Sequence, residues 1–172
     1  SGARVSGLTL TAPSGSSVIS PATTVVEALM DSYRTANPLA SDDDIAAQQT
    51  QVYADTAEAL GLSSDVDLTS YNPLSSSVDS TSADAIVYAA KAAQIVAVAN
   101  TIAEAESATA GGGDKGDILG KALSAVATEI AASAAADSVI NIDAAFVGTI
   151  ISAAAPTMNA DATLKADLSS AI

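Results

Sequence analysis

The stretch from residue 83 to residue 109 constrains the fold most, because it contains neither glycine nor proline and is dominated by alanine. Alanine is the best helix former, since its side chain loses no rotamer freedom in a helix. Ser82 stands before this stretch as a candidate cap, and Gly111 follows it as a terminator. We therefore expect one long helix, and helices covered with alanine must approach one another closely, because small side chains fill little space.

The rest of the composition agrees with a small helical core. Hydrophobic residues make up 49% of the 172 residues, but only 3% are aromatic, with one Phe and no Trp. The core must then consist of alanine, valine, isoleucine and leucine. A chain of this length is sufficient for one domain with a modest core, or for one domain with a short appendage.

Start and stop signals for further helices recur along the chain. Ser20 precedes Pro21, which suits the first position of a helix, and Ser41 and Asp44 stand three apart as in a capping box. Gly61 is placed to end the second helix in a left-handed conformation. The predicted helices are residues 21–36, 42–60, 83–109, 117–135 and 144–154, with a sixth that starts near Asp161.

Apolar residues at helical spacing predict which faces are buried. In helix 21–36 the predicted stripe consists of Val25, Val26, Leu29, Met30 and Tyr33. Helix 83–109 has two such faces, one with Ile86, Ala90, Ala93 and Ala97 and one with Ile95, Val98 and Ile102. We therefore expect this helix to be buried on more than one side.

The predicted fold class is all-α, a bundle of four main helices plus one or two short helices, preceded by a short N-terminal extended segment. Residues 1–15 are expected to form an extended arm or linker, and residues 16–172 the bundle domain. Alternating residues at 8–11 favour a short strand, with an extended arm lying on the helices as the alternative. The long polar connection at 63–82 is expected to be anchored by four apolar residues, Val66, Leu68, Tyr71 and Leu74.

The charge balance excludes several kinds of partner. The formal net charge is −14, from 20 acidic and 6 basic residues. Nucleic acid needs a footprint of Lys and Arg, so no nucleic-acid partner is expected. Residues 85–103 are apolar but are interrupted by Lys91, Gln94 and Asn100, which predicts a buried helix and no membrane insertion. The negative charge itself is explained by solubility or, alternatively, by binding of divalent cations.

The chain lacks the residues of the commonest active sites. It has no cysteine and no histidine, which excludes Ser-His-Asp and Cys-His catalysis and the usual zinc sites. It also has no phosphate-binding GK[ST] loop. We therefore predict that the protein is not an enzyme.

Two acidic segments are candidates for calcium. The stretch "GGDKGDIL" at 112–119 resembles one unit of the glycine-rich repeat of RTX proteins, although Lys115 stands where Gly is expected and only one copy is present. In "SDVDLTSYNP" at 64–73, two aspartates lie on one side of an extended segment and could gather with Asp79 or Asp84 around a cation. The predicted metal ligands are Asp65, Asp67, Asp79, Asp114 and Asp117, with calcium as a possible cofactor. The alternative for each segment is a solvated loop with a helix cap.

Two longer segments carry a family resemblance. "LTLTAPSGSSVISPATTVVEALM" at 8–30 and "ALGLSSDVDLTSYNPLSSS" at 59–77 resemble a helical module of very large secreted bacterial surface proteins, which are RTX-type or cadherin-like multi-repeat adhesins. Ala22 replaces the usual Leu and Asn72 the usual Asp, and the second change removes a carboxylate. The resemblance implies secretion or a cell-surface location within a longer multidomain chain.

The function predicted from these observations is a non-enzymatic structural or interaction module, serving as a spacer or adhesion domain. Its expected partners are neighbouring domains of the same chain, other cell-surface proteins or glycans. The alternative is a ligand-binding helical bundle that holds a divalent cation such as calcium, or an apolar small molecule, between its helices.

Overall fold

The computed structural model describes residues 9–63, 65–73, 75, 78–79, 81–107, 114–136 and 138–154. Within these residues the chain forms five helices and no strand. The helices are α1 (Pro21–Ala36), α2 (Asp42–Ala59), α3 (Ala83–Ser107), α4 (Lys115–Ala135) and α5 (Ala144–Ala154). The predicted all-α class is confirmed, and the predicted helix bounds agree within two residues wherever the chain is described. The sixth predicted helix, near Asp161, lies outside the described residues.

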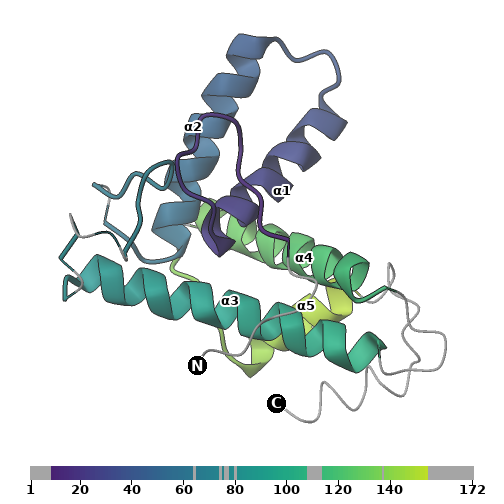
Figure 1. The fold of residues 1–172 in the computed structure, drawn as a ribbon. Coiled ribbons are helices and arrows are strands. Elements are labelled where there is room, and N and C mark those ends of the chain that lie inside the picture. The colour runs from purple at the N-terminus through teal and green to yellow at the C-terminus, as the bar shows by residue number, and fades with distance from the viewer. Residues whose placement is uncertain are drawn as a thin grey trace.

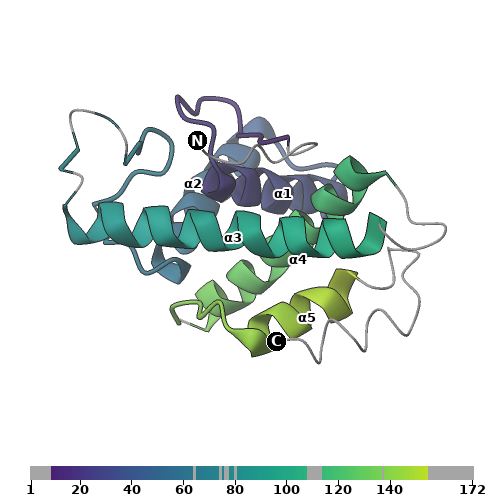
Figure 2. The same ribbon diagram turned by 60° about the horizontal axis from the view of Figure 1, so that its bottom comes forward.

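Helix α4 is the centre of the bundle. It packs against α1, α2, α3 and α5, and the α1–α2 pair lies on one side of it while α5 lies on the other (Figures 1 and 2). Its buried side chains form a nearly continuous surface of small and branched residues: Ile118, Leu119, Ala122, Leu123, Ala125, Val126, Ala127 and Ile130. The alanines among them allow the close helix approach expected from the composition.

The buried faces of the outer helices are only partly those predicted. In α1, Val25, Val26 and Met30 are fully buried, whereas Leu29 and Tyr33 are half-buried. The face of α3 with Ile95 and Ile102 is buried against α4 and α1. The second predicted face of α3 is exposed, and its members are Ile86, Ala90, Ala93 and Ala97. The prediction of burial on two sides was wrong, because no described element packs on that side of α3.

The N-terminal segment is an extended arm and not a strand over the part that is described. The amide of Thr11 donates to the hydroxyl of Thr24 at 3.0 Å. The carbonyl of Thr11 accepts from the hydroxyls of Thr23 and Thr24, at 3.2 and 3.0 Å. These hydroxyls, at the start of α1, take the place of a neighbouring strand, so the predicted strand was wrong for residues 9–11.

The end of α2 has the geometry that the sequence predicts. Gly61 has a φ of 77°, its amide bonds to Glu58 O, and the amide of Leu62 bonds to Ala57 O at 3.0 Å. This pair of bonds is a Schellman motif, with Leu62 as its buried apolar residue. The segment after α4 closes onto the same point, where the amide of Ile140 donates to Ala59 O at 2.7 Å.

Candidate functional site

One candidate site is a groove between α2 and the connection that follows it. Its volume is 560 Å³. One face of α2 contributes Gln49, Thr50, Tyr53, Ala54, Ala57 and Glu58, and the connection contributes Leu62, Ser63, Val66, Asp67, Leu68 and Thr69. We call this the α2 groove. Its size is that of a small-molecule site.

The floor of the α2 groove is apolar and its rim is polar. The side chains of Tyr53, Ala57, Leu62 and Leu68 are buried and form the floor. The rim consists of residues with exposed polar groups, namely Thr50, Glu58, Ser63 and Asp67. A ligand with an apolar body and a polar head would match this arrangement.

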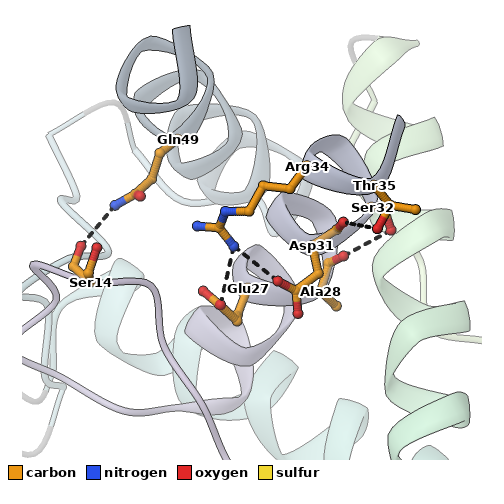
Figure 3. Close-up of polar contacts among 8 residues, drawn as sticks. All are labelled: Ser14, Glu27, Ala28, Asp31, Ser32, Arg34, Thr35 and Gln49. Carbon is orange, nitrogen blue, oxygen red and sulfur yellow. Dashed lines mark hydrogen bonds and ion pairs between the residues drawn. The ribbon is translucent and has the colours of Figure 1, made fainter. Parts of the chain in front are cut away.

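The extended segment that precedes α1, which includes Ser14, Ser16 and Ser17, is hydrogen-bonded to both walls of the groove. The hydroxyls of Ser16 and Tyr53 are hydrogen-bonded to each other. The amide of Ser17 donates to Thr69 O at 2.8 Å, which ties the arm to the connection. In Figure 3 the amide group of Gln49 points at the arm and donates to Ser14 O at 3.1 Å. The arm therefore fixes both walls of the groove relative to each other.

The acidic residue on the connection side is held in a tight turn. Asp67 Oδ1 accepts from the amide of Thr69 at 2.9 Å, and Oδ2 accepts from the hydroxyl of Ser70 at 3.2 Å. Interactions with the side chain and backbone of Thr69 lower the pKa of Asp67, because they stabilise the charged form. The groove thus carries a fixed negative charge at this position.

The pKa of Tyr53, in the floor of the groove, is affected by this negative charge. Burial raises the pKa of Tyr53, and the hydrogen bond from Ser16 offsets part of the rise. The negative charges of Glu27 and Asp67 raise the pKa further. Tyr53 therefore stays protonated at neutral pH and serves as a polarisable, uncharged surface.

Of the five predicted metal ligands, only Asp67 lines the groove. Asp65 is exposed in a neighbouring turn, and Asp79 accepts from the amide and hydroxyl of Thr81 at 2.8 and 2.7 Å. Asp84, the alternative to Asp79, accepts from the amide and hydroxyl of Ser63 at 2.9 and 2.8 Å and so ties the start of α3 to the end of α2. Asp67, Asp79 and Asp84 therefore bond to three different segments.

The other two predicted ligands belong to a helix start. Asp114 is the N-cap of α4 and accepts from the amides of Gly116 and Asp117, at 2.9 and 3.3 Å. Asp117 is exposed in the first turn of α4. Across the described ranges, no three acidic residues gather in a geometry that could hold a metal ion. The helix-cap alternative accounts for Asp114, and the calcium prediction receives no support from this part of the chain.

A second polar cluster lies on α1 (Figure 3). Arg34 forms ion pairs with Asp31 at 3.0 Å and with Glu27 at 3.4 Å. The other Glu27 oxygen, Oε2, is buried and has no partner among the described residues. The hydroxyl of Thr35 donates to Asp31 O at 2.8 Å and so bonds within the helix. Arg34 therefore offsets one of the two negative charges on this face of α1 and is itself paired.

Sequence reasoning identified the anchors of the connection but missed the groove that they form. Leu68 is buried and Val66 and Tyr71 are half-buried, as expected, while Leu74 lies outside the described residues. The signal that could have revealed the groove is the polar face of α2 around Tyr53, which lies opposite those anchors. The sequence alone does not show that these two surfaces pack beside each other and leave a groove between them.

Two of the described helices are long and apolar enough to cross a membrane, judged by length and composition alone. They span residues 83–104 and 116–135, with mean hydropathies of 1.4 and 1.3. Core helices of a bundle pass the same test, and these two pack against each other here. The absence of membrane insertion therefore stays a prediction.

The chain matches no protein-family model, no curated protein and no solved structure.

Proposed function

We propose that this chain is a non-enzymatic structural or interaction module, a spacer or adhesion domain of an exported multidomain bacterial surface protein. The observation that carries the proposal is the direct contact between the two segments that resemble such modules. Residues 8–30 and 59–77 are far apart in the sequence, yet Ser17 N bonds to Thr69 O at 2.8 Å. Tyr88 of α3 contacts both segments, because its hydroxyl donates to the Ser20 hydroxyl at 2.6 Å and its ring packs edge-on against Tyr71 with the ring centroids 5.4 Å apart.

The polar surface also supports this proposal. Exposed serine and aspartate side chains cap helices and close turns at Ser41, Asp67, Asp79 and Asp114. A bundle held together in this way presents hydroxyls and carboxylates to its neighbours. Such a surface suits transient contacts with other domains or with glycans.

Antibody labelling of intact cells tests the proposal. An antibody raised against this chain should label intact cells of the producing organism, with a cytoplasmic protein of the same cells as the negative control. Labelling that appears only after the cells are permeabilised would overturn the surface location.

A ligand-binding helical bundle is the second candidate, and the α2 groove favours it. The groove has a volume of 560 Å³ and an apolar floor. A bound ligand stabilises the folded state by RT ln(1 + [L]/Kd), so a binder has a ligand-dependent melting temperature. A simple spacer has none.

A further inference from the structure

We infer that the α2 groove binds a small organic cation, an ammonium or guanidinium group carried on an apolar body. This inference rests on the second candidate function and names its ligand class. It follows from the charge and the surface of the groove.

The described lining residues of the groove include two carboxylates and no basic side chain. Glu58 and Asp67 stand on opposite walls, and none of the lining residues is Lys or Arg. The carboxylate of Glu58 is exposed and has no hydrogen bond within the described ranges. Arg34 and Lys91 do not line the groove. Arg34 pairs with acids of α1, and Lys91 donates to Ile140 O at 2.6 Å. A cationic head is the complement of this rim.

The floor suits the body of such a ligand. Leu62, Leu68 and Ala57 offer aliphatic surface, and Tyr53 adds an aromatic ring. A cation near a tyrosine ring gains cation–π attraction, and the neighbouring methylene groups of the ligand bury apolar area. The 560 Å³ volume accommodates one small amphipathic molecule.

A metal ion fits the groove less well than an organic cation. Calcium takes six to eight oxygen ligands. Both carboxylate oxygens of Asp67 already accept hydrogen bonds from Thr69 and Ser70. No three acidic residues gather around a common point in the part of the chain that the structure describes. An organic cation needs only charge and contact, which Glu58 and Asp67 supply without giving up those bonds.

The test uses a matched pair of probes, 4-phenylbutylammonium and the uncharged 4-phenylbutan-1-ol. Both are titrated into the isotope-labelled chain, and amide shifts are followed by NMR. The ammonium should shift the signals of residues 49–58 and 62–69, and the alcohol should bind several-fold more weakly. Equal affinity for the two probes, or no shift at these residues, overturns the inference.

Variants separate the groove from the general negative charge. Glu58→Gln should weaken the ammonium about two- to fivefold, as expected for one exposed charge. Asp43→Asn removes the same charge at the far end of α2, outside the groove, and should leave binding unchanged. An equal loss in both variants would mean diffuse attraction to an acidic protein and would contradict the inference.

A third variant fills the groove without touching its charge. Ala54 is exposed on α2 and lines the groove, so Ala54→Trp should block the ammonium while the melting temperature stays close to that of the wild type. Retained affinity in this variant overturns the inference. Failure of these titrations would leave the surface-module proposal standing, because antibody labelling tests that proposal independently.

Discussion

Tyr88 of α3 donates a hydrogen bond to the hydroxyl of Ser20 at 2.6 Å, so the long helix holds the cap of the first helix. Both residues are buried. The Ser20 hydroxyl oxygen also accepts from the amide of Thr23 at 3.1 Å, and the Ser20 amide donates to the hydroxyl oxygen of Thr23 at 2.8 Å. The start of α1 and its packing on α3 are therefore a single structural feature.

Ser20→Ala should lower the free energy of unfolding by about 2 kcal/mol, since it removes the cap and leaves the Tyr88 hydroxyl buried without a partner. Tyr88→Phe should cost less, about 1 kcal/mol, because Ser20 keeps its bonds to Thr23. The double variant should lose less than the sum of the two. Urea unfolding of all three variants measures this, and strictly additive losses would show that the two hydroxyls do not interact.

Gly61→Ala should destabilise the chain by about 1 kcal/mol or more, because a left-handed residue is strained with a side chain. Its φ is 77°, and an added Cβ would lie 3.0 Å from Val139 Cγ1. Gly120→Ala is the matched control in α4, where an added Cβ meets nothing within 4 Å. It should stabilise by about 0.5–1 kcal/mol. Thermal melting measures the stability of both variants. Unchanged stability in Gly61→Ala would contradict the Schellman geometry.

Ile102→Asp should abolish the cooperative unfolding transition, since Ile102 is 1% exposed and an unpaired charge there has no partner. Ile86→Asp on the same helix should be nearly neutral, because Ile86 is 58% exposed. Leu29→Asp should fall between them, since Leu29 is half-buried. Circular dichroism melting ranks the three, and equal damage from Ile86→Asp would mean that the exposed face of α3 is covered.

The contrast between Ile102 and Ile86 shows where sequence reasoning stops. Helix positions, caps and terminators followed from local rules, since Ser20, Ser41 and Gly61 each act on backbone groups within a few residues. Which side of an alanine-rich helix is buried depends on partners elsewhere in the chain. In α3 both faces are apolar, so periodicity could not choose between them.

The predicted metal ligands do not gather in the described part of the chain, for a related reason. Asp65, Asp67 and Asp79 are close in sequence, but each carboxylate is free to bond within its own turn, as Asp67 and Asp79 do. Short-range hydrogen bonds to Thr69 and Thr81 compete with the binding of one metal ion by several aspartates. The spacing of the aspartates in the sequence does not show which of the two forms. Whether the α2 groove forms depends on the distance at which α2 packs against the connection. No local sequence pattern specifies that distance.

Asp67→Asn should be less stable than the wild type at neutral pH, and this difference in stability should disappear in acid. The pKa of Asp67 is lowered from 3.8, so its charged form stabilises the fold above that pH, and the contribution disappears as pH falls through the folded-state pKa. The net charge of the chain changes with pH in both proteins, so the difference between variant and wild type isolates this one group. Urea midpoints at neutral pH and well below pH 3.8 measure it. A difference that grows in acid would have the wrong sign.

We propose that the stability of this chain comes from helix packing and helix caps and not from a bound ion. Differential scanning calorimetry of the chain in millimolar calcium chloride and in excess EDTA tests this most directly. We predict one cooperative transition with the same midpoint in both solutions. A midpoint that rises in calcium and falls again in EDTA would contradict the claim and favour a calcium-dependent fold.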